Sequence, residues 1–586
     1  MHRTHTCWEL NAHAIWRNII LSWRVAKKRN LGWLIFIDMR DRYGITQVTI
    51  DPSDVSVELA TIAESLKNEF VIKVHWSVVA RPDNMVNKDM KTWDIEIHAT
   101  SVEILSKSKE LPFNMWEDPK TSEENRFMYR YLDIRRKPVL DNIMFRAQMN
   151  HFTRNRFTKE WFLEVQTPIF TVSSPEWARD YLIPSRVNQG QFYALPQAPQ
   201  QYKQLLMVGW VDKYFQIAPC FRDEDPRADR HSCEFYQIDC EMSFVEKEDV
   251  YTVAEWYIRD MTSQMVPHKT IQIDFVRLSY ADAMDTYGSD KPDLRFDCKM
   301  IDVKDIFGSS ELDFLRTAVS VKAIKLWSHP TRKELDALTK FVQNIGLGWL
   351  AYIQIKEDTI SGSIANKMSQ QEKDLIVESM WGAVWDTIFL LVWDQKTVVS
   401  VWAKFRNHLR DTFDLVDKDA LGFVWIEDFP FFEEDETKPS GLEFAHNPFS
   451  NIKWGHETVD TLPPLERETT QYDLTCNWYE ILSGSIRNHN PDVLLKAFEA
   501  AGYELQDIKK RFWTMYEALQ YWCPPHGWFA FGFDRLMMIL RDEPNIRECY
   551  AFPKSGRAQD LMMWAPSNVD PKELDILGLE MKKKEE

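Results

Sequence analysis

Alternating apolar and polar positions fill most of the first hundred residues. Strands with this two-residue period are predicted at residues 15–25, 34–40, 45–50, 70–80 and 93–104. Residues 55–68, between the third and fourth of these strands, instead have helical spacing. Three strands, a helix and two strands follow the order of an OB barrel, a small fold that often binds single-stranded nucleic acid.

The pattern becomes helical after a polar, charged stretch that we interpret as a hinge, residues 107–135. A long amphipathic helix is predicted over residues 138–162, and it is followed by the extended run Gln166-Thr167-Pro168. Residues 214–221 and 234–244 then alternate as two strands joined by a charged loop.

Residues 287–420 have a different pattern, with short helical and strand-like segments and no motif to which we can assign a reaction. An inserted domain is the simplest interpretation. Apolar and alternating runs resume at Phe423 and continue to the neighbourhood of Arg535.

The length of the chain supports several domains, and its charge is unevenly distributed along the sequence. The chain has 586 residues, whereas single hydrophobic cores stop growing near about 250–300 residues. Its formal net charge of −18 excludes a wholly basic nucleic-acid coat. Residues 1–50, however, hold eight Lys or Arg and three Asp or Glu, so a local basic surface accompanies the predicted barrel.

The eight cysteines are scattered, without a Cys-x-x-Cys pair, which is typical of a reduced compartment. No signal peptide is visible, and the longest apolar run, Ile388 to Trp393, is far below the roughly 18 residues that cross a bilayer. We therefore expect a soluble cytoplasmic protein. Glycine is scarce, with 19 residues or about 3% against a usual value near 7%, while tryptophan reaches 24.

Two arginines stand in positions suited to phosphate chemistry. Arg222 follows the strand at 214–221, and its planar guanidinium can hold a phosphate and a carboxylate together. Arg535 ends the run Gly532-Phe533-Asp534-Arg535, which opens a predicted helix whose backbone N–H groups would suit a triphosphate.

These segments resemble the class II aminoacyl-tRNA synthetases (subclass IIb), and within them the bacterial-type aspartyl-tRNA synthetases. The three class motifs occur in order, at Thr167-Pro168, residues 221–225 and residues 532–535. The resemblance extends from near residue 7 to about 566 and is carried further by the strings at 34–42, 178–182, 287–295 and 551–554.

The resemblance implies an α+β multidomain protein: an OB barrel, an antiparallel-sheet catalytic domain and an α/β insertion. The expected organisation is an anticodon-binding barrel at 1–106, a hinge at 107–135, a catalytic domain at 136–286 and 421–560, an insertion at 287–420 and a C-terminal extension at 561–586.

The implied reaction is activation of L-aspartate by ATP with Mg²⁺, followed by transfer to the 3′ end of tRNA(Asp). Positioning and charge neutralisation should dominate such an in-line transfer, and the resemblance makes Arg222, Arg535 and Glu480 catalytic. It assigns Mg²⁺ to Asp473 and Glu480, whose oxygens suit a hard cation. ATP contacts are expected from Arg222, Asp223, Glu224, His231, Glu480, Gly532, Phe533, Asp534 and Arg535.

Aspartate itself needs a cationic pocket for its side-chain carboxylate, and the resemblance assigns this role to Lys203 and Arg487. Two cations should reject asparagine, because its neutral amide would leave buried charge uncompensated. The remaining aspartate contacts are expected from Glu176, Gln200, Arg222 and His446.

For the tRNA, the resemblance places anticodon recognition on Arg29, Phe36 and Gln47, where a ring stacks a base and polar groups read its edge. Without the resemblance, a phenylalanine in a barrel strand is more often a core residue. Leu31 is similar to forms restricted to tRNA(Asp), whereas forms that also charge tRNA(Asn) tend to carry histidine there. The first class motif implies a homodimer interface around Pro168.

The chain departs from the family around the expected adenylate. Leu482 and Ser483 stand where the family has a glycine-rich turn, and Trp528 stands where the family has a glycine in the strand of the third motif. His231 replaces a glutamine, Asn447 a histidine and Ala198 a serine. If the turn needs positive φ, Leu482 would strain or fill the site. Two hypotheses therefore remain: an active aspartate–tRNA ligase, or a fold-retaining relative that binds tRNA or dimerises with little amino-acid activation.

Overall fold

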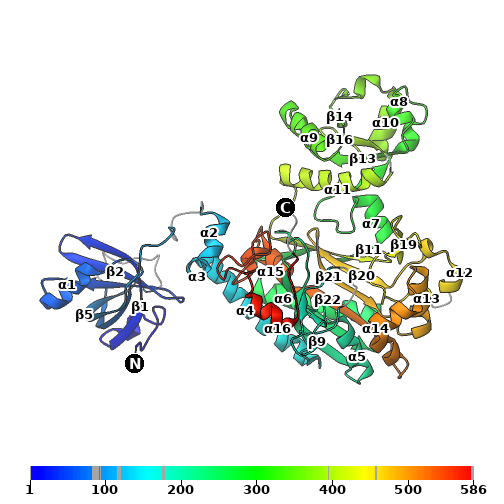
Figure 1. Ribbon diagram of the computed structural model, residues 1–586. Coiled ribbons are helices and arrows are strands. Elements are labelled where there is room, and N and C mark those ends of the chain that lie inside the picture. The colour runs from blue at the N-terminus through cyan, green and yellow to red at the C-terminus, as the bar shows by residue number, and fades with distance from the viewer. Residues whose placement is uncertain are drawn as a thin grey trace. The chain divides into compact units, whose positions relative to one another are not determined.

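The computed structural model describes residues 2–81, 92, 94–114, 121–173, 178–228, 230–346, 348–393, 395–455 and 458–582 (Figure 1). It consists of two compact units, Met1–Asp141 and Asn142–Glu586.

The first unit contains a closed five-stranded barrel with the strand order β1-β2-β3-β5-β4, which confirms the predicted OB fold. Its elements are β1 (Asn18–Leu31), β2 (Leu34–Arg40), β3 (Ile45–Ile50), α1 (Val57–Ser65), β4 (Val71–Ala80) and β5 (Ile95–Ser106), preceded by the short helix η1 (Ala12–Ala14). The two-residue period places Ile35, Ile37 and Met39 of β2 in the barrel interior, where they are buried. The intervening side chains of the same strand face outward.

The predicted hinge is partly helical. Residues 123–133 form α2 (Glu123–Met128) and α3 (Arg130–Asp133) around the fully buried Asp133. Burial alone would raise the pKa of Asp133, but the guanidinium groups of Arg126, Arg130 and Arg136 outweigh it and lower that pKa. Several charged residues of this stretch therefore belong to an ionic cluster around a buried carboxylate.

The second unit is built on an eight-stranded sheet with the order β11-β17-β20-β21-β22-β10-β9-β6. Only its edge pairs, β11 with β17 and β6 with β9, are parallel, so the predicted antiparallel sheet is confirmed. The strands are β6 (Leu163–Glu164), β9 (Lys213–Phe221), β10 (Glu234–Ser243), β11 (Thr270–Ser279), β17 (Ala420–Glu427), β20 (Gln471–Cys476), β21 (Tyr479–Ile486) and β22 (His526–Gly532).

Two long helices, α4 (Lys137–Lys159) and α6 (Lys247–Met265), pack aromatic side chains against this sheet. Phe157 of α4 stacks on Phe215 of β9 at 5.2 Å between ring centroids, and Tyr257 of α6 lies 5.3 Å from Phe531 of β22. These contacts hold one face of the sheet rigidly, which leaves the other face to carry a site.

Between β11 and β17 the chain forms a second, five-stranded sheet with the order β12-β13-β16-β14-β15. Trp402, Phe405 and Leu391 belong to its own hydrophobic core, as expected for an inserted domain. Its elements are β12 (Met300–Asp302), η3 (Lys304–Phe307), α8 (Asp313–Arg316), β13 (Ser320–Leu326), α9 (Arg332–Asn344), β14 (Ala351–Ile355), β15 (Ile360–Gly362), η4 (Ala365–Lys367), α10 (Gln370–Ser379), β16 (Thr387–Trp393) and α11 (Gln395–Thr412).

The remaining elements connect these layers. They are β7 (Leu182–Pro184), β8 (Phe192–Ala194), α5 (Gln200–Val208), α7 (Tyr280–Tyr287), β18 (Phe432–Glu434), β19 (Leu442–Phe444), α12 (Thr458–Thr461), η5 (Pro464–Glu466), α13 (Pro491–Ala500), α14 (Leu505–Leu519), α15 (Phe533–Leu540), η6 (Ile546–Cys549) and α16 (Pro571–Leu577).

Candidate functional site

A cavity of about 250 Å³ lies over the middle of the eight-stranded sheet. Strands β10, β21 and β22 form its floor, and the loop after β9 and the start of α15 form its walls. The lining includes Arg222, Arg230, His231, Phe235, Gln237, His446, Asn447, Gln471, Glu480, Leu482, Ser483, Trp528, Gly532, Asp534 and Arg535. Segments more than 300 residues apart in the chain therefore meet at one site.

The two predicted phosphate-binding arginines both line this cavity. The guanidinium carbon of Arg222 lies 5.1 Å from the ring centroid of Phe235, and its buried Nε has no hydrogen-bond partner among the described residues. Arg535 donates a hydrogen bond to the backbone carbonyl of Glu480. Fixed guanidinium groups facing a hollow can receive a polyphosphate.

The acidic pair Asp473 and Glu480 comes from the neighbouring strands β20 and β21. Burial, followed by the charge of Glu480, raises the pKa of Asp473 to about 8. Burial would also raise the pKa of Glu480, but the charges of Lys291 and Arg535 outweigh it and lower that pKa.

The same pair fits a hard divalent cation. Oδ1 of Asp473 is buried without a hydrogen-bond partner among the described residues, and the ammonium of Lys291 lies 3.3 Å from Oε2 of Glu480. The donors are carboxylate oxygens, and Oδ1 of Asp473 still lacks a partner, so Mg²⁺ is chemically compatible with this position.

Lys291 and Asp290 are site residues to which sequence reasoning gave no role. Lys291 Nζ lies 2.6 Å from Asp290 Oδ2 as well as near Glu480, and burial does not prevent these carboxylates from raising the pKa of Lys291. The available signal was the string Tyr287 to Arg295, which carried the family resemblance but suggested no function.

The predicted aspartate pocket is a buried ionic cluster. Lys203 on α5 is hydrogen-bonded to Asp239 and lies 3.4 Å from Glu241, and Arg487 donates to Glu241 at 3.0 and 3.2 Å. Arg487 also donates to Oε1 of Gln200 at 3.1 Å. The structure thus brings together Lys203, Arg487 and Gln200, and it adds two acidic partners from β10 that the sequence did not reveal.

Unsatisfied polar atoms point to a ligand at this cluster. The buried atoms Nη1 of Arg487, Nε2 of Gln200 and Oδ2 of Asp239 have no hydrogen-bond partner within the described part of the chain. Buried polar groups are rarely left unpaired, because each one costs about 1–3 kcal/mol. Burial, partly offset by Lys203, raises the pKa of Asp239 to about 6, so this carboxyl can change protonation when charge enters.

Trp528 separates the cluster from the cavity. Its ring centroid lies 4.2 Å from Nζ of Lys203 and 4.5 Å from the guanidinium carbon of Arg487, and its Nε1 donates to Oγ of Ser485 at 2.8 Å. Trp528 lines the cavity, whereas neither cation is among the lining residues. The indole therefore occupies the approach to the predicted carboxylate pocket.

The expected strain at Leu482 is not found. Leu482 has no left-handed backbone, and its side chain is 1% exposed in the core. The glycine that this turn needs is Gly484, where a Cβ would lie 2.3 Å from the carbonyl oxygen of Trp528. The expectation of backbone strain at Leu482 was therefore wrong, because the close approach occurs two residues later. Leu482 lines the cavity, so the expectation that its side chain fills the adenylate site stays a prediction.

The other predicted ATP contacts lie in different surroundings. Asp223 and Glu224 line a neighbouring cavity together with His231, which borders both. Phe533 is fully buried in the core, and Asp534 pairs with Arg146 and accepts hydrogen bonds from the Tyr236 amide and the Tyr550 hydroxyl. Gly532, Phe533 and Asp534 thus shape the wall around Arg535.

Of the remaining predicted aspartate contacts, Glu176 lies outside the described residues. His446 lines the cavity, and its ring packs against Phe429 at 4.7 Å. Burial, opposed by Asp290, lowers the pKa of His446 and favours its neutral form.

The predicted anticodon residues share the outer face of the barrel. Phe36 is paired with Arg29 of β1, and Gln47 of β3 is paired with Asp38 of β2. Neither Phe36 nor Gln47 belongs to the barrel core, so the core interpretation of Phe36 is excluded. Asp38, which the sequence did not single out, pairs with Arg29 at 2.7 Å.

Pro168 lies in a run of exposed apolar side chains. Ile169, Phe170 and Val172 are 47%, 60% and 60% exposed. Contiguous exposed apolar side chains are characteristic of protein interfaces.

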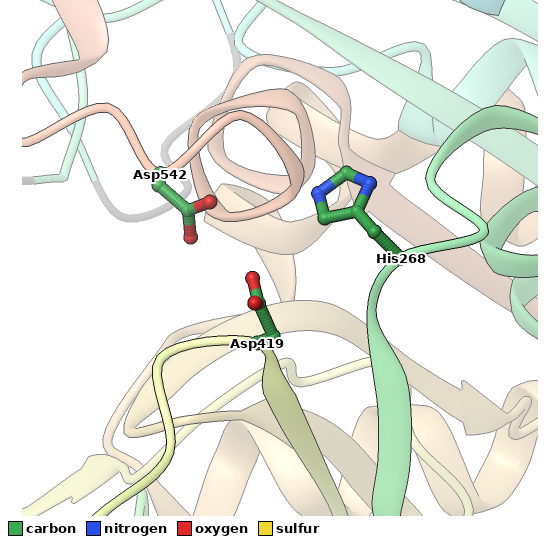
Figure 2. Close-up of side chains that lie close together, drawn as sticks. All are labelled: His268, Asp419 and Asp542. Atoms are coloured by element: carbon green, nitrogen blue, oxygen red, sulfur yellow. The ribbon is translucent and has the colours of Figure 1, made fainter.

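Another cluster, His268, Asp419 and Asp542, lies just before β11, just before β17 and just after α15 (Figure 2). All three side chains are exposed, and the ammonium of Lys269 lies 2.7 Å from Asp542 and 3.8 Å from Asp419. Exposed acidic groups commonly lie close together without a metal, so we do not assign one to this cluster.

All eight cysteines are free thiols. Among the helices that the structure describes, none combines the length and apolar character required to cross a membrane.

Comparison with known proteins agrees with this architecture. The family model of class II tRNA synthetases (D, K and N) matches residues 122–556, and that of the OB-fold nucleic acid binding domain matches residues 20–105. The chain is 43% identical over 590 residues to the aspartate–tRNA(Asp/Asn) ligase of Chlorobaculum parvum, covering 100% of this chain and 97% of that protein. It is 42% identical over 594 residues to that of Pelagibacter ubique, covering 100% and 99%.

Solved structures show the same fold at low identity. Asparaginyl-tRNA synthetase from Pyrococcus horikoshii, complexed with asparaginyl-adenylate, matches with a TM-score of 0.59 at 17% identity, covering 95% of this chain and 99% of that one. Aspartyl-tRNA synthetase from Entamoeba histolytica matches with a TM-score of 0.56 at 17% identity, covering 94% and 91%.

Proposed function

The chain belongs to the class II aminoacyl-tRNA synthetases, and we propose that within this family it is an aspartate–tRNA ligase that forms aspartyl-adenylate from L-aspartate and ATP. The observation that carries the proposal is the convergence of Arg222, Arg535 and Glu480 on one cavity, with Asp473 buried on the strand next to Glu480 and the Lys203 and Arg487 cluster behind Trp528. Full-length identity above 40% to enzymes named for this activity supports it. No observation favours the alternative of a relative without amino-acid activation.

In the proposed first step, an oxygen of the aspartate α-carboxylate attacks the α-phosphorus of ATP and the bond to pyrophosphate breaks. Arg222 would neutralise charge on the α-phosphate and the incoming carboxylate, and Arg535 would hold the γ-phosphate. Guanidinium groups fixed before the reaction stabilise the transition state without reorganisation. Mg²⁺ held by Asp473 and Glu480 would supply charge neutralisation on the phosphates.

Aspartate is the proposed amino acid because its side-chain carboxylate matches the unpaired Nη1 of Arg487 beside Lys203. Asp239 and Glu241 already balance these cations, so the cluster is neutral before the substrate enters. The argument from two cations in the sequence did not include these two carboxylates. A proton taken up by Asp239 as the substrate enters would leave one cation free for the substrate carboxylate.

In the second step the aspartyl group moves to the 3′ end of a tRNA. We propose that the tRNA anticodon binds the outer barrel face formed by Arg29, Phe36 and Gln47. The half-buried ring of Phe36 on the outer barrel face would stack on a base, and the polar groups beside it would read base edges.

The range of tRNAs is a further part of the proposal. The relatives are named for both tRNA(Asp) and tRNA(Asn), whereas Leu31, which is 62% exposed at the end of β1, favours restriction to tRNA(Asp). We propose the narrower specificity, together with a homodimer whose interface includes Pro168 and a cytoplasmic location consistent with eight free thiols.

ATP–pyrophosphate exchange with the purified enzyme tests the proposed function. Exchange should depend on aspartate, and asparagine and lysine should not replace it. Exchange driven by asparagine or lysine would contradict the pocket assignment. Binding of tRNA without exchange under any amino acid would favour the non-activating relative.

A further inference from the structure

Two groups stand out among the tryptophans that the structure describes. Nine of them have a left-handed backbone, with φ between 46° and 90°: Trp16, Trp161, Trp210, Trp381, Trp385, Trp454, Trp478, Trp522 and Trp564. Others, such as Trp76, Trp402 and Trp425, have ordinary backbones and are buried in hydrophobic cores.

Left-handed backbone is the conformation of glycine. Side chains with a Cβ clash there, and a bulky residue with positive φ is a rare outlier. Tryptophan makes up 24 of the 586 residues, yet it accounts for nine of the seventeen non-glycine residues with positive φ in the described chain. The nine tryptophans thus stand where the fold calls for glycine.

Helix ends give a direct internal comparison. After α4 the amide of Trp161 donates to Thr158 and the next amide to Phe157, and the same pair of bonds follows α5 at Trp210 and α10 at Trp381. This arrangement is the Schellman motif, whose left-handed residue is usually glycine. Gly502 and Gly578 make the identical pair of bonds at the ends of α13 and α16.

A hairpin repeats the pattern. Asn477 and Trp478 form the two-residue loop between the paired residues Cys476 and Tyr479, with φ values of 55° and 90°. Two-residue hairpins with both φ values positive strongly prefer Asn-Gly.

The side chains of this class add little to the fold. Trp522, Trp210 and Trp161 are 94%, 92% and 88% exposed, whereas Trp425 is fully buried, stacks on Tyr251 and donates to Glu255. Large exposed rings at turns provide no packing that would offset the backbone strain.

Trp528 joins this class for a different reason. Its backbone is not left-handed, but its ring covers both Lys203 and Arg487 and blocks the approach to the proposed aspartate pocket. A glycine there would leave the approach open. This part of the inference rests on the proposed function, and the nine backbone positions do not.

We propose that the functional protein carries glycine at these nine positions and at position 528. The printed sequence translates two different codons as tryptophan, and the cell that makes the protein reads one of these two codons as glycine. A genetic code that reads UGA as tryptophan gives this residue two codons, UGG and UGA, and UGA differs from the glycine codon GGA by one base. Two codons match two classes: UGG for the buried tryptophans, and UGA for those at glycine positions. The shortage of glycine and the excess of tryptophan follow from the same cause.

The gene and the protein from its natural source test this proposal without an activity assay. The ten codons should be UGA, with UGG at Trp76, Trp402 and Trp425, and peptide mass spectrometry should find glycine at the ten positions and tryptophan at these three. UGG codons at the ten positions, or peptides that contain tryptophan there, would overturn it.

Recombinant variants provide a second test. Replacing the nine left-handed tryptophans with glycine should raise the midpoint of thermal unfolding, whereas the control Trp402→Gly should lower it. Adding Trp528→Gly should raise aspartate-dependent exchange at least tenfold above that of the chain with Trp528. If peptides carry glycine at position 528 but the ten-glycine variant shows no exchange, the proposed function fails while the decoding proposal stands. A nine-glycine variant less stable than its parent would contradict the backbone argument.

Discussion

The indole ring of Trp528 covers the ammonium of Lys203, with 4.2 Å between Nζ and the ring centroid. Lys203 is fully buried, so the ring stands on the side from which a ligand in the cavity would approach. This one contact decides whether the cation cluster can bind a substrate carboxylate.

We predict that Trp528→Gly raises kcat/KM for aspartate in ATP–pyrophosphate exchange by about tenfold or more, equal to at least ~1.4 kcal/mol of transition-state binding. Removing the ring opens the path from the cavity to Lys203 and Arg487. Trp210→Gly serves as the control, because Trp210 is an exposed tryptophan outside the cavity lining. Equal gains in both variants would show that the effect is on stability and not on the pocket.

Arg222→Ala should lower exchange by roughly 10²–10³-fold, the usual loss when one fixed transition-state donor is removed. Its unpaired Nε and its place on the cavity wall make it the group most available to a reacting phosphate. Filter binding of tRNA should be unchanged, because the proposed anticodon face lies on the barrel. Exchange at the parental rate would remove Arg222 from the proposed mechanism.

The barrel can be tested separately from the catalytic cavity. Phe36→Ala and Gln47→Ala should leave exchange intact and should impair charging of tRNA, since loss of one stacked base costs about 1–3 kcal/mol. Ile37→Val, a neighbouring core change, controls for barrel stability. Loss of exchange and charging to the same extent in Gln47→Ala would contradict the separation of the two roles.

The sequence predicted those elements in which local pattern and tertiary environment agree. The two-residue alternation of Ile35, Ile37 and Met39 fixed the barrel strands, because one face of each strand is buried. The sequence did not indicate the two short helices within the predicted hinge, because Asp133 gathers three arginines into an ionic cluster, and such a cluster has the same composition as a solvated linker.

Predicting the site required knowledge of which charges meet. Resemblance indicated Lys203 and Arg487 but not Asp239 and Glu241, because alternation alone does not show which face of a central strand meets a pair of cations. Lys291 was missed for a related reason: it reaches Glu480 from a loop almost 190 residues earlier in the chain.

The protonation of Asp473 predicts a specific pH dependence of stability. Its pKa of about 8 in the folded protein lies above the ordinary value, so between about pH 4 and pH 8 the folded state retains a proton that the unfolded chain has lost. Stability therefore falls as pH rises through this window. Asp473→Asn should remove that fall, so its advantage over the parent in urea unfolding should grow between about pH 5 and about pH 8. An advantage that is constant with pH would contradict the buried, protonated carboxyl.

The variant Leu482→Gly tests whether position 482 requires glycine for activity or leucine for stability. If the turn needed glycine, the change would raise activity. Leu482 instead has an ordinary backbone and is 1% exposed in the core, between its strand partners Leu474 and Phe531. We therefore predict a loss of about 3–5 kcal/mol in unfolding free energy, from the cavity left by the side chain and the added chain flexibility. Exchange should not increase, and Leu482→Met, which preserves volume, should behave like the parent. A rise in exchange without a loss of stability would mean that the leucine side chain, and not only Trp528, restricts the adenylate site.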